Sequence, residues 1–134
     1  MSRLLRPARL LLATSLLGLT GLTACASHDP GMDPDSPAYL VRHGEFEAAF
    51  TRARERYEED PDDEVRLKTY VIAAAIFNLH RGRELTFADR DEEAMDFFYR
   101  AKALAPEAAE IDHWIAKTRE KIAEFAGLAI RAGD

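Results

Sequence analysis

The sequence is poor in the residues that cross-link small proteins or hold metal ions. It contains one cysteine, Cys25, so no disulfide can form within the chain and a zinc site of several thiolates is excluded. Its histidines are widely spaced, and none forms a close ligand pair with another. Glycine-rich phosphate loops and nucleophile motifs are also missing from the sequence. We therefore expect no metal ion, no cofactor, no small-molecule substrate and no enzymatic activity.

Acidic residues are missing from the first 24 positions, although the rest of the chain is strongly acidic. The only charged residues there are Arg3, Arg6 and Arg9. From Cys25 onward, 15 basic residues stand against 24 acidic ones, a formal charge of -9. Binding to nucleic acid requires Lys and Arg to replace phosphate counterions, so we expect no nucleic-acid partner. Anionic lipids would repel the same surface, so attachment to a membrane would need another feature.

The amino-terminal segment supplies such a feature. Residues 1–9 are basic, and residues 10–24 form an apolar run that is shorter than the roughly 20 residues of a membrane span. The run has the length of a secretory signal core and ends in Leu22-Thr23-Ala24-Cys25. This ending resembles the bacterial lipobox, in which small residues precede a cysteine that accepts a diacylglyceryl group. An ordinary signal peptide with a chance cysteine, or an uncleaved anchor helix, are the alternatives.

The resemblance to bacterial lipoproteins implies three segments. Residues 1–24 would be a signal peptide, and residues 25–36 would be the lipidated Cys25 followed by a flexible linker rich in Asp, Pro and Gly. Residues 37–134 would be the folded domain. Several acyl chains on one residue, such as a diacylglyceryl group and palmitate, suffice for stable anchoring. We thus expect a lipid-anchored protein on the exported side of a bacterial cell membrane, and Ala26 after the cysteine favours the outer membrane.

From Pro37 onward the apolar residues recur at helical spacing, and no stretch alternates as a strand would. The pattern predicts an all-α domain whose helices cover approximately 38–43, 45–59, 63–87, 91–105 and 107–130. The third of these contains an apolar stretch that extends around the whole helix, so we expect it to be the buried centre. Whether this helix breaks at Gly82 stays open, because glycine costs about 1 kcal/mol relative to alanine. The fifth helix is expected to carry one apolar face, formed by Ile111, Trp114, Ile115, Ile122, Phe125 and Ala126. Trp114 is therefore expected in the core, whereas Arg81 and Arg83 could grip an acidic partner or be solvated.

Two segments, 44–61 and 89–106, repeat one pattern 45 residues apart. Each has a turn residue, acids, an alanine and a final proline, and Asp89 stands where the first copy has the turn glycine Gly44. The pattern resembles the second helix of the tetratricopeptide repeat, whose period is about 34 residues. The resemblance implies a short solenoid of antiparallel helix pairs with the last helix as a cap. An insertion into the third helix would explain the longer period.

In tetratricopeptide repeats the first helix of each pair lines the binding face. By this resemblance, the candidate partner-binding residues are Val65, Lys68, Ile72 and Ile76, although they could also be core residues. Such faces bind extended or helical peptide segments. We therefore predict a membrane-anchored protein–protein interaction scaffold of the bacterial cell envelope, with envelope proteins or their peptide segments as partners. The alternative is a structural accessory subunit of a pilus, secretion or outer-membrane assembly complex.

Overall fold

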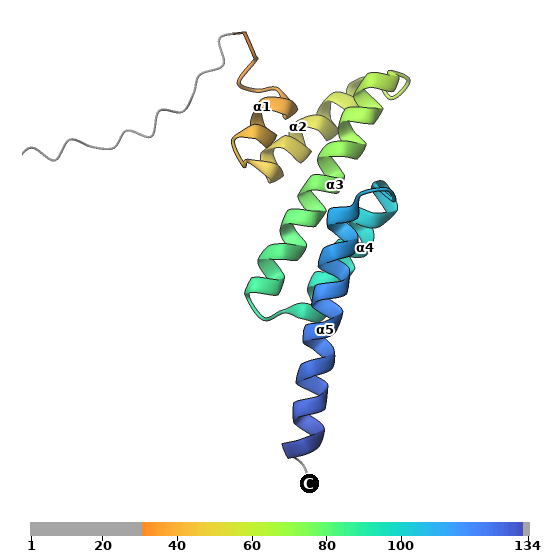
Figure 1. The fold of residues 1–134 in the computed structure, drawn as a ribbon. Helices are drawn as coiled ribbons and strands as arrows, with labels where there is room; N and C mark the ends of the chain where they lie inside the picture. Colours follow the sequence, from red (N-terminus) through yellow and green to blue (C-terminus); the bar gives the residue numbers. More distant parts are fainter. Residues whose placement is uncertain (1–30, 133–134) are drawn as a thin grey trace, which may run out of the picture. The chain divides into compact units, whose positions relative to one another are not determined.

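The computed structural model describes residues 31–132, and this part of the chain contains helices and turns but no strand. The all-α prediction is confirmed, and each expected helix lies within two residues of the observed bounds. The five helices, coloured along the chain in Figure 1, are α1 (Pro37–Arg42), α2 (Phe46–Glu59), α3 (Glu64–Phe87), α4 (Asp91–Leu104) and α5 (Ala109–Ala132). The expected signal peptide, the lipidated Cys25 and the linker up to residue 30 lie outside the described residues.

The helix starts follow from local capping. The Ser36 hydroxyl caps α1 by accepting a hydrogen bond of 3.2 Å from the backbone N–H of Tyr39, and proline occupies the first helical position. The Asp63 carboxylate caps α3 by accepting from the N–H groups of Val65 and Arg66 at 2.8 and 3.1 Å. These interactions use backbone donors that a helix leaves free at its first turn.

The end of the expected linker is attached to α2. Residues 31–36 form turns, and Asp33 lies 3.2 Å from the Arg56 guanidinium, as an exposed ion pair. Asp35 lies 3.8 Å from the guanidinium of Arg52, also in α2. Exposed pairs of this kind contribute at most about 1 kcal/mol each.

Helix α3 runs without a break through Gly82 and packs against both α2 and α4. α2 packs along α3 from Tyr70 to His80, where the rings of Tyr57 and Tyr70 stack at 5.3 Å and those of Phe46 and His80 approach to 4.4 Å. α4 packs against the carboxy-terminal part of α3 (Figure 1). Within the described chain α2 and α4 make no contact with each other, so α3 alone connects them.

The hydrophobic core lies where α3, α4 and the first half of α5 meet. Phe98 of α4 is completely buried and stacks near the Trp114 ring at 6.1 Å. Gly82 makes room for it, because a Cβ atom there would lie 2.5 Å from Cε1 of Phe98. The buried members of this core are Leu85, Ala94, Met95, Phe98, Ala101, Ile111, Trp114 and Ile115.

Two expectations about burial are wrong in part. α3 is not buried on every side, because the side that carries Ile72 meets no other helix and this residue is 55% exposed. The apolar face expected along α5 is buried only in its first half. Beyond Ile122, which is partly buried, Phe125 is 57% exposed and Ala126 is also exposed. The reason is that α5 extends past the α3–α4 turn, where α4 begins (Figure 1).

The 45-residue repeat comprises two units of two helices, α2 with α3 and α4 with α5. α2 and α4 have 14 residues each and start 45 residues apart, at Phe46 and Asp91. α3 and α5 have 24 residues each and start 45 residues apart, at Glu64 and Ala109. α5 is therefore the counterpart of α3. α5 matches α3 in length, so the extra residues that an insertion would add to the third helix are also present in the fifth helix.

The turns that precede α2 and α4 are built by the same hydrogen bonds. Glu45 donates its N–H to the Leu40 carbonyl at 2.9 Å, and Arg90 donates to the Leu85 carbonyl at 2.9 Å. These bonds belong to the Schellman motif, which requires a left-handed residue one position earlier. Those residues are Gly44, with φ +76°, and Asp89, with φ +58°. The prediction that an aspartate takes the place of the turn glycine is confirmed.

Candidate functional site

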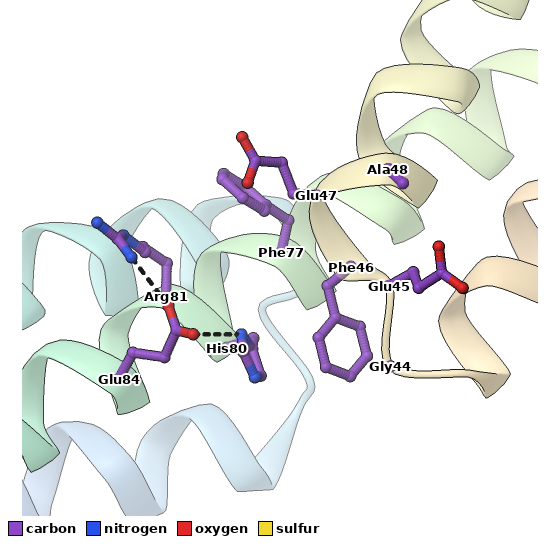
Figure 2. A pocket seen from close by; sticks show the side chains of 9 residues that line it. All are labelled: Gly44, Glu45, Phe46, Glu47, Ala48, Phe77, His80, Arg81 and Glu84. Atoms are coloured by element: carbon purple, nitrogen blue, oxygen red, sulfur yellow. Dashed lines mark hydrogen bonds and ion pairs between the residues drawn. The ribbon is translucent and has the colours of Figure 1, made fainter.

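A pocket lies in the angle where the start of α2 meets the middle of α3 (Figure 2). Its volume is about 390 Å³, and Phe46 forms one wall with its ring against the imidazole of His80. The lining residues are Gly44, Glu45, Phe46, Glu47, Ala48, Phe77, His80, Arg81 and Glu84. This pocket was not predictable from the sequence, because it depends on how α2 packs against α3.

The polar side chains of this pocket are paired along one helix. Glu84 accepts a hydrogen bond of 3.0 Å from the Arg81 guanidinium and lies 3.7 Å from Nδ1 of His80 (Figure 2). These spacings of three and four residues place the side chains on neighbouring positions of α3. No hydroxyl or thiol occurs among the lining residues, so the pocket supplies a carboxylate–imidazole pair but no nucleophile of that kind.

A second pocket occupies the same place in the next helix pair. Eight of the nine lining positions of the first pocket recur 45 residues later, as Asp89, Arg90, Asp91, Glu92, Glu93, Ile122, Phe125 and Ala126. The volume is larger, about 680 Å³, and Asp91 stands where the first pocket has the ring of Phe46. The second pocket is therefore wider than the first, and most of its polar lining residues are acidic.

Lys121 crosses from α5 to this acidic turn. Its ammonium group donates to the Thr86 carbonyl at 2.9 Å, to Asp89 at 2.8 Å and to Asp91 at 3.1 Å. The hydrogen bond to Asp89, followed by that to Asp91, raises the pKa of Lys121 above its ordinary value of 10.5, while partial desolvation opposes the shift. Lys121 thus holds α5 against the α3–α4 turn. No local sequence pattern predicts this contact, because it depends on where α5 docks.

A second ion pair neutralises part of the same rim. Arg90 donates to both oxygens of Glu93, at 2.7 and 2.5 Å. The hydrogen bond from Arg90 is the main cause that holds the pKa of Glu93 below its ordinary value of 4.5. Both side chains are more than half exposed, so the pair contributes mainly local order at the start of α4.

The four predicted partner-binding residues lie along one side of α3. Their spacing of three and four residues gives them a common face. Val65 is 72% exposed, Ile72 is 55% exposed, Lys68 is exposed and Ile76 is partly buried. Further along the same side, α5 covers the helix, where the guanidinium of Arg83 lies 5.1 Å from the Trp114 ring. The part of this side from Val65 to Ile72 is mostly exposed, although Val65 borders a hollow that it shares with Ala53, Arg56 and Glu59 of α2.

The two arginines that flank Gly82 are both engaged within the chain. Arg81 pairs with Glu84, and Arg83 pairs with Glu110 at 3.6 Å as well as stacking on Trp114. Trp114 is only 8% exposed, which confirms its expected place in the core. Arg83 and Trp114 therefore contribute to the docking of α5, whereas the pair of Arg81 lies within α3.

Two further properties concern residues 31–132. No group of three or more His, Cys, Asp or Glu side chains there is arranged to hold a metal ion. None of the described helices combines the length and the hydrophobicity needed to cross a lipid bilayer.

No family model, curated protein or solved structure matches the chain. Its function must therefore be inferred from its own residues.

Proposed function

We propose that this protein is a lipid-anchored interaction scaffold of the bacterial cell envelope. The observation that carries the proposal is the uncovered side of α3, where two aliphatic side chains, Val65 and Ile72, are more than half exposed around Lys68. Exposed aliphatic residues grouped on one face are typical of protein-binding surfaces. The lipobox-like Leu22-Thr23-Ala24-Cys25 supports the anchor and the exported location.

The repeat supports a tetratricopeptide-like interpretation of the domain. Each helix pair exposes an apolar face that a neighbouring helix covers, which is the principle of helical solenoids. The sequence pattern of glycine, alanine and proline favours the tetratricopeptide type. The 45-residue period exceeds the 34 residues of that type and lies within the range of HEAT and armadillo repeats, about 40–47 residues. We therefore propose a long variant of a helix-pair repeat.

The side of α3 can be tested by capture of partners from envelope extract. We expect the double substitution Lys68→Glu and Ile72→Asp to reduce recovery of a specific partner at least about tenfold, because a buried charge replaces an apolar contact. The free energy of unfolding should change by less than about 1 kcal/mol, since both side chains are exposed. Quantitative mass spectrometry of the captured proteins measures the effect.

The matched control is Leu67→Asp. Leu67 is 41% exposed and lies about 200° around α3 from Val65, on the opposite side of the helix. Its substitution should leave capture unchanged. A partner that is lost equally with all variants, or no specific partner at all, would contradict the proposed surface.

The anchor is tested at the amino terminus of the native protein. We expect intact mass spectrometry to show Cys25 as the first residue, carrying a diacylglyceryl group and a further acyl chain. Cys25→Ser should move the protein from the membrane fraction to the soluble exported fraction, because the acyl chains provide the attachment. Retention of residues 1–24 with an unmodified thiol would refute the lipoprotein assignment.

One observation favours the alternative of a structural subunit. The second half of α5 exposes apolar residues that no described helix covers, including Phe125 and Leu128. In a larger complex this end of the domain would be buried by another chain.

A further inference from the structure

The carboxy-terminal half of α5 has the features of a helix that lacks a neighbour. It extends beyond the α3–α4 turn (Figure 1), and Phe125 and Leu128 are 57% and 59% exposed. Between them in sequence stands Gly127, where an added Cβ would meet no described atom within 4 Å. Glycine within a helix costs about 1 kcal/mol relative to alanine, and nothing within the described domain compensates for that cost.

The internal repeat shows what such a glycine does when it is covered. Gly127 lies 45 residues after Gly82, at the same place in α5 as Gly82 in α3. Over Gly82 lies the ring of Phe98, supplied by α4. The position over Gly127 is where the next helix of the repeat would place an equivalent aromatic ring.

A groove marks this position. Its volume is about 520 Å³, and its lining residues are Glu120, Ala123, Glu124, Gly127 and Leu128. The residues 45 positions earlier are Ala75, Asn78, Leu79, Gly82 and Arg83, all of which are buried or partly buried in the part of α3 that packs against other helices. The groove therefore corresponds to the contact surface of α3 for α4.

The charge of the groove differs from that of its counterpart. Glu120 and Glu124 replace Ala75 and Leu79, and neither carboxylate has an ion-pair partner among residues 31–128. A second copy of the chain would bring more negative charge, since its formal charge from Cys25 onward is -9. The groove is therefore complementary to a basic helix from a different protein.

We propose that this groove binds an amphipathic, basic helix of another protein. An aromatic side chain of that helix lies over Gly127, as Phe98 lies over Gly82, and lysine or arginine side chains meet Glu120 and Glu124. The inference rests on the proposed function as a binding module and names the class of one partner. It concerns α5, so it is separate from the uncovered side of α3.

The test uses the full chain in detergent and a synthetic helical peptide. The peptide has the 14-residue sequence of α4, with its four acidic residues replaced by lysine and its aromatic residues retained. We expect saturable binding to the wild-type chain by isothermal titration calorimetry. The same peptide with alanine in place of the phenylalanine equivalent to Phe98 should bind about tenfold more weakly, and the unmodified acidic α4 peptide should not bind.

Variants of the chain locate the binding site. Gly127→Leu should weaken binding at least about tenfold while raising the thermal unfolding temperature, because leucine is the better helix former and fills the groove. Ala116→Leu, at an exposed position in the first half of α5, is the matched control and should leave binding unchanged. Glu120→Lys with Glu124→Lys should exclude the lysine peptide and admit the acidic one.

Three outcomes would overturn the proposal. Absence of peptide binding would mean that α5 ends the stack as a polar cap. Unchanged affinity in Gly127→Leu would place the peptide elsewhere. A dimer of the wild-type chain in sedimentation experiments that is abolished by Gly127→Leu would make a second copy the occupant. None of these results bears on partner capture by Lys68 and Ile72, so failure here and failure of the proposed function are distinguishable.

Discussion

Replacing Phe98 with alanine is expected to lower the free energy of unfolding by about 3–5 kcal/mol. The side chain is completely buried, it fills the space above Gly82, and it stacks near Trp114. Its removal leaves a cavity at the junction of α3, α4 and α5, which is the largest part of the core. Denaturant unfolding followed by circular dichroism measures the change.

The matched control is Phe125→Ala. This residue is also a helical phenylalanine, but it is 57% exposed on α5 and belongs to no buried cluster. Its substitution should change the free energy of unfolding by no more than about 0.5 kcal/mol. Equal losses in the two variants would mean that the core does not lie where α3 and α4 meet.

Gly82→Ala is expected to be destabilising by about 1–3 kcal/mol, although alanine is the better helix former by about 1 kcal/mol. The new methyl group would lie 2.5 Å from Cε1 of Phe98, and that ring is enclosed on all sides. The clash must move α4 away from α3, which loosens the core. Thermal and denaturant unfolding of the purified variant test this expectation.

Gly127→Ala supplies the opposite expectation at the equivalent position of α5. No described atom lies within 4 Å of its added Cβ, so helix propensity alone acts and the variant should gain up to about 1 kcal/mol. Combining Gly82→Ala with Phe98→Leu should cost less than the sum of the two single substitutions, because the smaller side chain relieves the clash. Stability changes of the same sign in the two glycine variants would contradict the close packing of the Phe98 ring over Gly82.

The helices were predictable from the sequence because their ends are encoded locally. Ser36 and Asp63 cap helices through contacts with residues two or three positions away, and Pro61 and Pro106 follow helix ends. The left-handed turn at Asp89 was also predictable, since the repeat aligns it with Gly44. Such signals do not depend on how the helices pack.

The burial of individual helix faces was not predictable in the same way. An apolar stripe shows that a helix can be covered, but only the number of neighbouring helices decides whether it is. The expectation failed for Ile72, because helices pack on α3 without reaching its side, and for Phe125, because no described helix follows α5. The contact of Lys121 with the α3–α4 turn joins residues 30 or more positions apart, a distance that no local pattern encodes.

The candidate sites also differ in how far local sequence patterns predict them. The position of Val65, Lys68, Ile72 and Ile76 on one side of a helix follows from their spacing alone, whereas their role in binding stays a prediction. The two pockets in the angles between helices required the three-dimensional turn geometry. The lining positions of the two pockets correspond because the 45-residue repeat includes α5 as the counterpart of α3.

Helix α3 supports both α2 and α4, and this limits where the chain can be divided or extended. Since α2 and α4 touch α3 but not each other, no break point between 64 and 87 separates the domain into two self-sufficient halves. Deletion of either half would strip the surviving one of its supporting helix. We therefore expect this fold to tolerate an inserted unit only after a long helix, because a break inside α3 would separate α2 and α4 from the helix that both contact.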